Sequence, residues 1–173
     1  GPESPSAFLF DNIHDYEVEI AEEDWQWLRT NALDETYVPA TVRFQGETYS
    51  AAIRYKGGGT LSTTCFDESG QICKVSMKVS FNEYDDEGRF FGLKKILFHS
   101  MLRDPTLMHD SLSYQLFEDM GLPSPRTSYA RLTINGQYLG LFAFIEYVDG
   151  RFARRVFSDG GQGNLYKAAF PKY

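Results

Sequence analysis

The sequence predicts an α+β fold made mainly of antiparallel strands, with one prominent helix inserted among them. Short segments in which apolar and polar residues alternate recur along the chain, as they do in half-buried strands. The dipeptide Asn135-Gly136 is a strong signal for a two-residue hairpin. A single longer helical pattern begins at Asp104-Pro105-Thr106 and stops at Gly121, which are typical start and stop signals.

The first half of the chain is predicted to hold most of the strands and one short helix. Residues 22–31 predict the helix, because acidic residues open the segment and Trp25 and Leu28 lie three apart on one face. The acidic segment 82–90 predicts a loop. The strands predicted in this half cover residues 16–20, 38–44, 48–56, 74–81 and 93–98, with a hairpin turn at Gln45-Gly46-Glu47.

The second half carries the main helix, whose apolar stripe consists of Leu112, Leu116, Phe117 and Met120. Strands are predicted over residues 128–134 and 137–147, on either side of the Asn135-Gly136 turn. Residues 149–157 predict a short helix, and a glycine-rich turn precedes a last short strand over residues 164–167.

Length and composition indicate one domain, or part of one, in 173 residues and 19.8 kDa. We expect residues 1–10 to be a lead-in and residues 11–173 to form the domain. Gly1-Pro2 resembles a protease-cleavage scar, so a natural leader is expected to be missing. A net charge of −7 argues against a broad nucleic-acid-binding face. No apolar run approaches the ~20 residues that a membrane helix needs.

A basic, glycine-rich stretch is the strongest candidate for a binding site. Arg54 and Lys56 lead into Gly57-Gly58-Gly59, and a second predicted strand returns with Lys74 and Lys78. Glycines let backbone N–H groups approach an anion, and alternate strand positions place both lysines on one face. This arrangement predicts a polyphosphate site. The alternative is a surface hairpin with solvated basic side chains.

An ordered series of segments runs from about Asp15 to Lys167: residues 37–42, 54–57, 74–81, 104–110, 134–141, 145–149 and 163–167. This series resembles the CotH family, the spore-coat-protein-H-like atypical protein kinases. The resemblance implies the small lobe of a kinase, hence the nucleotide-binding half of an enzyme that transfers phosphate from ATP to Ser or Thr of protein substrates.

The resemblance implies roles for particular residues. Lys78 is the leading candidate for the phosphate-binding lysine, and Lys74 is the second. Asp110 occupies the place of an acid that orients such a lysine, although His109 precedes it where the family pattern has an arginine-like residue. The alternative for Asp110 is an acid that favours the start of a helix. His99 shows no partner pattern and receives no role.

Residues 145–150 resemble a kinase hinge, in which Glu146 and Val148 lie beside an adenine ring. The alternative is an ordinary buried strand that ends where Asp149 caps a helix.

The family's catalytic and metal-binding aspartates are expected beyond Tyr173, so Mg²⁺ or another divalent metal is expected only with the complete catalytic lobe. Two further functions remain open: a non-catalytic surface-binding or adhesin module, and a structural part of a larger extracellular assembly. The expected partner is a protein substrate or surface protein. Without a second lobe, exposed apolar faces favour a dimer or a swapped oligomer.

Cys65 and Cys73 flank a turn-rich tip at residues 67–70, and facing positions across a hairpin lie within disulfide reach. The alternative is two unrelated thiols in a cytosolic protein. The bridge favours an extracytoplasmic protein, either secreted, in a coat or at the cell surface.

We predict that Cys65 and Cys73 are bridged in the folded protein. The closed loop is short, so the bridge should stabilise the fold by roughly 2–3 kcal/mol. Alkylation and mass spectrometry without reductant should find neither thiol free. Two alkylated cysteines in the folded protein would contradict the prediction.

Overall fold

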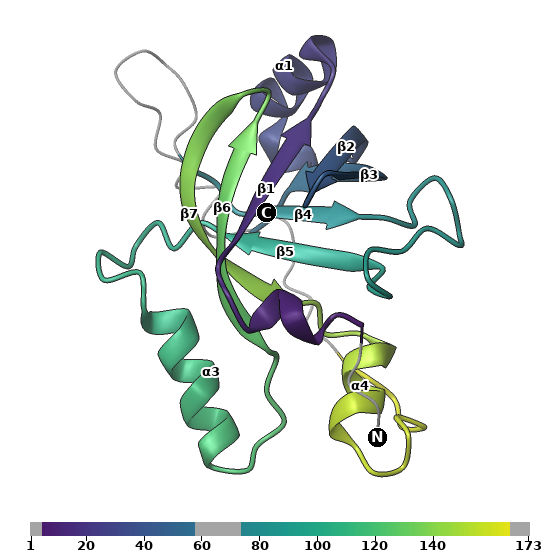
Figure 1. Cartoon of the computed structure of the whole chain (residues 1–173), viewed down its shortest axis with the longest axis vertical. Coiled ribbons are helices and arrows are strands. Elements are labelled where there is room, and N and C mark those ends of the chain that lie inside the picture. Colours follow the sequence, from purple (N-terminus) through teal and green to yellow (C-terminus); the bar gives the residue numbers. More distant parts are fainter. Residues whose placement is uncertain (1–4, 58–73, 167–173) are drawn as a thin grey trace.

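The computed structural model describes residues 5–57 and 74–166, which form a closed barrel of seven strands in the order β1-β2-β3-β4-β5-β7-β6 (Figure 1). Within these described residues, three α-helices and two short 3₁₀ helices accompany the barrel. The strands are β1 His14–Glu19, β2 Val38–Phe44, β3 Glu47–Tyr55, β4 Met77–Ser80, β5 Lys95–His99, β6 Thr127–Ile134 and β7 Gln137–Glu146. The helices are η1 Ala7–Phe10, α1 Glu22–Thr30, η2 Ala32–Asp34, α3 His109–Asp119 and α4 Gly150–Val156.

The predicted α+β fold, a kinase-type small lobe with one prominent helix, is wrong. The described structure is mostly sheet, and its three α-helices are short. The prediction rested on one prominent helix inserted among antiparallel strands. In the structure no residue of α3 is buried, and the sheet covers its own apolar face by curling into a barrel.

Barrel closure depends on β1, which pairs with β2 on one side and with β6 on the other. The β1–β2 pair is antiparallel, whereas the β1–β6 pair is parallel and runs from His14↔Ala130 to Val18↔Ile134. On the outer side of this parallel pair, Arg131 Nε donates to Asp15 Oδ1 at 2.6 Å. The remaining neighbouring strands are all antiparallel.

Aromatic rings fill the barrel. Tyr16 lies at the centre, 1% exposed, and stacks on Phe144 with ring centroids 5.2 Å apart. Phe90 reaches into the same core from the loop between β4 and β5 and is completely buried. Alternation along the strands explains this core, because every second residue of each strand points inward. The largest fully buried aromatic side chains are Tyr16, Phe44, Phe90, Phe98, Phe142 and Phe144.

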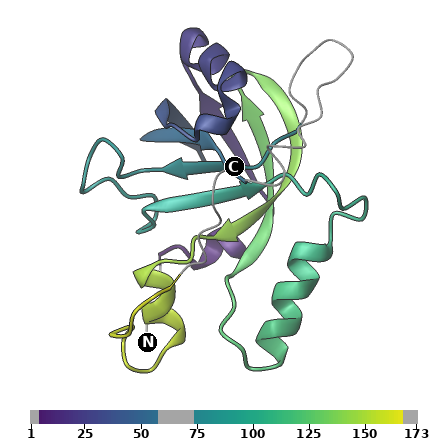
Figure 2. The same ribbon diagram turned by 180° about the vertical axis from the view of Figure 1, so that it is seen from behind.

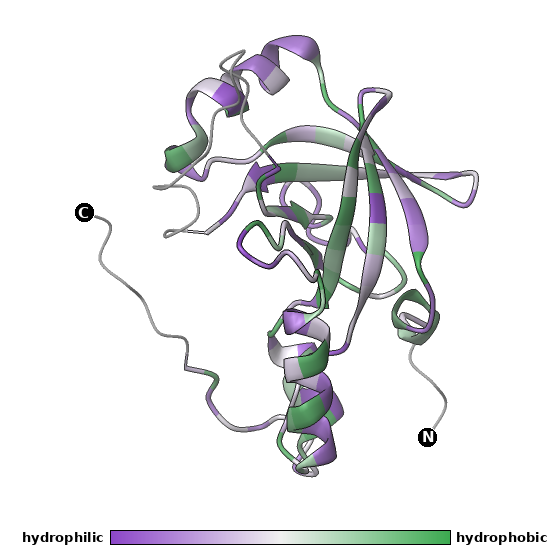
Figure 3. Ribbon diagram, turned by 90° about the vertical axis from the view of Figure 1, so that its left-hand side faces the viewer, coloured by the Kyte–Doolittle hydropathy of each residue, from purple (hydrophilic) through white to green (hydrophobic). Residues whose placement is uncertain are grey.

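The helices lie at the two ends of the barrel. Figures 1 and 2 show α1 at one end and both α3 and α4 extending from the other. The helix α1 packs through buried Leu28. Leu112, Leu116, Phe117 and Met120 of α3 are 56%, 57%, 43% and 65% exposed, and Figure 3 shows hydrophobic stretches on α3 where it faces the viewer below the barrel. The predicted stripe therefore exists, but it faces solvent.

Most predicted elements are confirmed, with shifted ends. The strand predicted over residues 74–81 forms only from Met77, and the one predicted over 164–167 does not form in its described part, residues 164–166. No helix in the described ranges has the length and apolar character that a membrane crossing requires. Cys65 and Cys73 lie outside the described residues, as do Gly58 and Gly59.

The main helix begins at His109, later than the start predicted at Asp104. Asp104 instead holds the preceding turn: its Oδ1 accepts from the N–H of Thr106 at 3.0 Å and its Oδ2 from the N–H of His109 at 2.8 Å. Burial alone would raise the pKa of Asp104, but these hydrogen bonds and the Thr106 hydroxyl outweigh it and lower the pKa to about 2.

Asn135 joins the β6–β7 turn to the end of β1. Its φ of 48° suits the predicted hairpin, and Gly136 follows at 78°. The N–H of Ile20 donates to Asn135 Oδ1 at 2.8 Å, and Asn135 Nδ2 donates to the carbonyl of Ile20 at 2.9 Å. Together these bonds fasten the hairpin to the closing strand.

We predict that Asn135→Ala lowers the free energy of unfolding by about 2–3 kcal/mol, because it removes two hydrogen bonds and leaves a Cβ at a left-handed position. Asn135→Gly removes the hydrogen bonds but accepts the positive φ, so it should cost only about 1–2 kcal/mol. Urea unfolding followed by circular dichroism measures both. Equal stability of Asn135→Gly and the wild type would show that the side-chain bonds contribute nothing.

Candidate functional site

The outer face of strands β3, β4 and β5 carries Arg54 and Lys78, two of the basic residues that the sequence singled out. The inward residues of β4 and β5, Met77 and Val79 with Ile96 and Phe98, are buried in the barrel. The residues between them therefore point outward. The register places Arg54 opposite Lys78 and Lys78 opposite Leu97, which forms a row across three strands.

A hydrogen-bonded chain of Lys56, His99 and Asp110 lies at the end of this row. Lys56 Nζ is 2.6 Å from His99 Nε2, and His99 Nδ1 is 3.3 Å from Asp110 Oδ2. A lysine ammonium can only donate, so Nε2 of His99 is the acceptor and its ring proton lies on Nδ1, directed at Asp110. The hydrogen bond between His99 and Asp110 links strand β5 to the first turn of α3.

Burial and neighbouring charges lower the pKa of both Lys56 and His99. Burial, together with the charges of Lys78 and Arg54, lowers the pKa of Lys56 to about 8. Burial and the Lys56 charge lower the pKa of His99, although Asp110 opposes the shift. The imidazole is therefore neutral at neutral pH, and Lys56 is held by a neutral partner rather than by a carboxylate.

Lys78 is likewise held by a neutral partner. Its Nζ donates to the hydroxyl of Tyr147 at 3.2 Å and lies 4.4 Å from the centroid of the Tyr147 ring. Burial lowers the pKa of Lys78, and Tyr147 partly offsets this shift. Within the described residues, the ion pairs involve neither Lys56 nor Lys78.

Arg54 differs from the two lysines because a carboxylate neutralises it. Its Nη1 lies 3.0 Å from Glu35 Oε1, and its guanidinium lies 5.3 Å from the centroid of the Tyr37 ring. Arg54 therefore borders the cluster as a paired residue.

The structure does not bring Lys74 together with Lys78. Lys74 precedes β4, where strand alternation does not apply, and its Nζ donates to the carbonyl of Leu141 and lies 4.6 Å from the Phe142 ring centroid. Both contacts are in the middle of β7, whereas Lys78 contacts Tyr147 beyond its end. Gly57 follows Lys56 with a φ of 109°, a conformation that favours glycine.

Glu146 lines a hollow together with Lys56, but its carboxylate forms a buried ion-pair cluster. Its side chain is 4% exposed and accepts from Arg126 Nη2 at 2.9 Å and from Arg155 Nη2 at 2.5 Å. Burial alone would raise the pKa of Glu146, but the hydrogen bonds from Arg155 and Arg126 outweigh it and lower the pKa. Asp149 accepts from the N–H groups of Arg151 and Phe152, so it caps α4, which agrees with the alternative interpretation of the hinge-like segment.

Two adjoining hollows run along the outer face of β5. The first, of about 580 Å³, is lined by residues that include Lys56, Gly57, His99 and Asp110. The second, of about 290 Å³, shares Lys56 and His99 with the first and continues past Leu97 to Tyr147 and Val148. The larger volume falls in the range of roughly 300–1,000 Å³ that is usual for small-molecule sites.

His99 and Tyr147 are the members of this site that the sequence analysis missed. Strand alternation held a signal for His99, because Leu97 and His99 are two apart and must share a face of β5. Nothing in the local pattern placed His99 opposite Lys56. Within the described ranges, no group of three or more His, Cys, Asp or Glu residues is arranged to hold a metal ion.

Comparison with known proteins agrees with the resemblance seen in the motifs. A family model described as CotH kinase protein matches residues 53–172. The inner spore coat protein H of Bacillus subtilis (strain 168) is 26% identical over 150 residues, which cover 86% of this chain and 38% of that protein. The inner spore coat protein H-like protein of the same organism is 34% identical over 73 residues, 42% of this chain and 22% of that protein. The chain thus spans less than half the length of these curated relatives.

We predict that Glu146→Gln lowers the free energy of unfolding by about 3 kcal/mol at pH 7, because two arginines lose their shared counter-charge. Glu118→Gln on exposed α3 is the matched control and should change stability by less than about 0.5 kcal/mol. Thermal or urea unfolding measures both.

The pH dependence of this effect has a defined sign. The folded-state pKa of Glu146 is lowered, so its contribution is fully present above the ordinary carboxyl pKa of about 4.3. The gap between Glu146→Gln and the wild type should therefore shrink as pH falls below that value. Equal stability of the two proteins at pH 7 would contradict the prediction.

Proposed function

Because this chain belongs to the CotH kinase protein family, we propose that it is the nucleotide-binding half of a coat-associated kinase that transfers phosphate from ATP to Ser or Thr of protein substrates. The coat association is proposed from the names of the two Bacillus relatives. The proposal concerns the whole parent protein, of which residues 1–173 supply the nucleotide site.

One observation carries the proposal: two lysines share an outer sheet face, and each is held by a neutral group. Lys56 donates to His99 and Lys78 donates to Tyr147. The charge of Lys78 lowers the pKa of Lys56, so the two ammonium groups repel each other. A polyphosphate would relieve this repulsion, and charge-assisted hydrogen bonds to phosphate are among the stronger polar contacts in proteins.

The described residues are of the chemical types that bind the phosphates and the base of an adenine nucleotide. Lys56 lines both hollows, and Lys78 borders the second through its partner Tyr147, so both lysines would contact the phosphates. The backbone at Gly57 leaves room for them. Leu97, Tyr147 and Val148 line the adjoining hollow and supply apolar surface and backbone groups for a base. Arg54 is expected to contribute less, because Glu35 already neutralises it.

His99 acts in this proposal as a positioning residue. It accepts from Lys56 and donates to Asp110, so it holds the lysine in relation to α3 without adding a charge of its own. In kinases a carboxylate from the neighbouring helix orients the phosphate lysine directly. Here the imidazole lies between the two groups.

Phosphate transfer also needs a metal and a carboxylate near the acceptor hydroxyl. The described residues lack a cluster that fits Mg²⁺, so we derive no step through a metal. We therefore assign nucleotide binding to this chain and the catalytic aspartates to the rest of the parent protein.

A non-catalytic surface-binding module is the second candidate function. The exposed apolar stripe of α3 favours it, because contiguous apolar side chains in water often mark a binding surface. Absence of nucleotide binding by both this chain and its full-length parent would favour this function over the first.

We predict that ATP binds this chain, and that Lys56→Met and Lys78→Met each weaken binding by about tenfold, equivalent to about 1.4 kcal/mol. Methionine keeps an apolar stem while removing the charge. Lys94→Met is the matched control, because Lys94 precedes β5 and lies outside the row formed by Arg54, Lys78 and Leu97, and it should bind ATP as the wild type does. Isothermal titration calorimetry at pH 7 measures the affinities, with circular dichroism to confirm folding.

Two results would change the assignment. If Lys74→Met abolishes binding while Lys78→Met does not, the phosphate lysine is Lys74. If Lys56→Met and Lys78→Met both bind ATP normally, the outer face of β4 and β5 is not the nucleotide site.

A further inference from the structure

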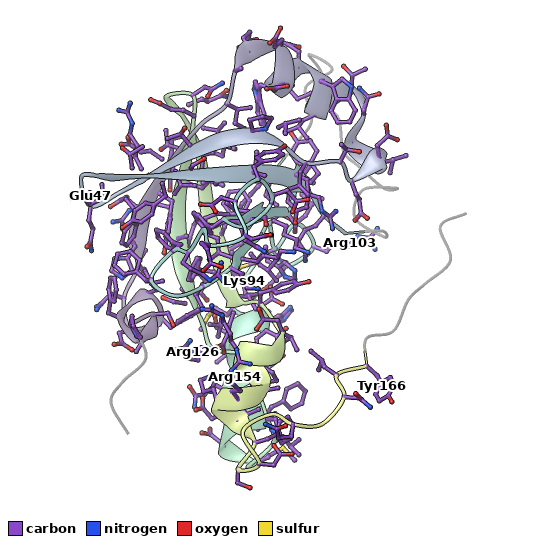
Figure 4. All side chains as sticks on the ribbon, turned by 90° about the vertical axis from the view of Figure 1, so that its right-hand side faces the viewer. Glu47, Lys94, Arg103, Arg126, Arg154 and Tyr166 are labelled. Carbon is purple, nitrogen blue, oxygen red and sulfur yellow. The ribbon has the colours of Figure 1, made fainter. Side chains whose placement is uncertain are left out.

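A second group of cations surrounds a hollow where β5 meets α4, which adjoins the proposed nucleotide site at Tyr147. The hollow measures about 380 Å³ and is lined by residues that include Lys94, Lys95, Arg151 and Arg154. Arg89 lies close enough to lower the pKa of Arg151. Figure 4 shows Lys94 and Arg154 on the same side of the molecule, where α4 meets the barrel. These five residues, Arg89, Lys94, Lys95, Arg151 and Arg154, are called the basic surface below.

In the part of the chain that the structure describes, no ion pair involves a residue of the basic surface. The ion pairs there engage other arginines, namely Arg43, Arg54, Arg126, Arg131 and Arg155. Arg89 donates only to backbone carbonyls, those of Asp86 and Gly88. Asp149 is the carboxylate that lines the hollow, and its Oδ1 is already engaged by the N–H groups that open α4.

Keeping these cations together is electrostatically unfavourable. Burial, followed by the charges of Arg89 and Arg154, lowers the pKa of Arg151, and Asp149 only partly opposes this. An anion that entered the hollow would relieve the repulsion. The concentration of five cations is notable because the whole chain carries a net charge of −7.

We propose that the basic surface is a docking site for an acidic segment of a protein partner. The five cations come from the loop before β5, from β5 and from α4, so they are spread along a surface rather than aimed at one point. Such a spread matches several carboxylates on an extended peptide better than a single phosphate group.

A nucleic acid fits the same surface less well. Its phosphates would be repelled by the remaining acidic protein, including the exposed acidic residues 83 and 85–87 in the neighbouring loop. Arg89 borders that loop and lines a different hollow with Glu83 and Asp85. A short acidic peptide can instead occupy the hollow lined by Lys94, Lys95, Arg151 and Arg154, whose lining does not include these two acids. The proposal is independent of ATP binding.

The test uses fluorescence anisotropy with a labelled 12-residue peptide of alternating Asp or Glu with Gly and Ser. The folded chain should bind it, and the affinity should fall about fivefold or more as salt rises, because exposed charges are screened. The double variant Lys94→Glu/Arg154→Glu should lose at least about tenfold in affinity. The milder Lys94→Gln/Arg154→Gln variant repeats the test if charge reversal disturbs folding.

Two controls separate a local site from a general charge effect. The double variant Arg29→Glu/Arg43→Glu changes the net charge equally on α1 and β2 and should bind the peptide as the wild type does. Lys56→Met/Lys78→Met, which removes both lysines of the nucleotide site, should also keep peptide binding. Loss of peptide binding in this variant would overturn the separation of the two sites.

Three further outcomes would overturn the proposal. The first is no binding of the acidic peptide at low salt. The second is an equal loss of affinity in the two charge-reversal variants, which would show that only net charge matters. The third is that a single-stranded 12-nucleotide DNA binds the basic surface as tightly as the peptide, which would make it a nucleic-acid surface.

Discussion

Pairing of β1 with β6 is the constraint on which the rest of the structure depends. It joins the first strand to a strand whose paired residues lie 116 positions later, and it turns a curled sheet into a closed barrel. Once the barrel is closed, each strand has one face in a dry aromatic core and one face outside. The basic residues of β3 and β4 then face outward, so the barrel itself gathers Arg54 and Lys78 on one surface.

The same constraint explains how the site is balanced electrostatically. Glu146, the nearest acid on β7, is directed at Arg126 and Arg155 and is not available to the outer lysines. Lys56 and Lys78 are left with His99 and Tyr147, which accept hydrogen bonds without neutralising charge. The charged groups of this region therefore form two sets. Glu146, Arg126 and Arg155 neutralise one another and support the fold, whereas Lys56 and Lys78 keep their charge on the outer face.

Local pattern predicted local structure well and long-range geometry poorly. Alternation located the strands, and Asn135-Gly136 located a hairpin whose φ values suit that turn. The family resemblance was also confirmed. Closure was not predictable, since the β1–β6 contact leaves no trace in either segment alone. The role of His99 depends on its position across from Lys56, and the solvent exposure of α3 depends on what packs against it, so periodicity could determine neither.

The parallel β1–β6 pair also has a consequence for synthesis of the chain. β1 can pair with β2 as soon as residue 44 has emerged, but its other edge must wait for β6, which ends at Ile134. At ribosomal rates of about 5–20 residues per second, that edge stays without its partner for roughly 5–20 s. Contacts between distant segments also form slowly. The nascent protein thus passes through a stage with an open strand edge beside aromatic side chains, and this stage is where chaperone engagement or aggregation competes with folding.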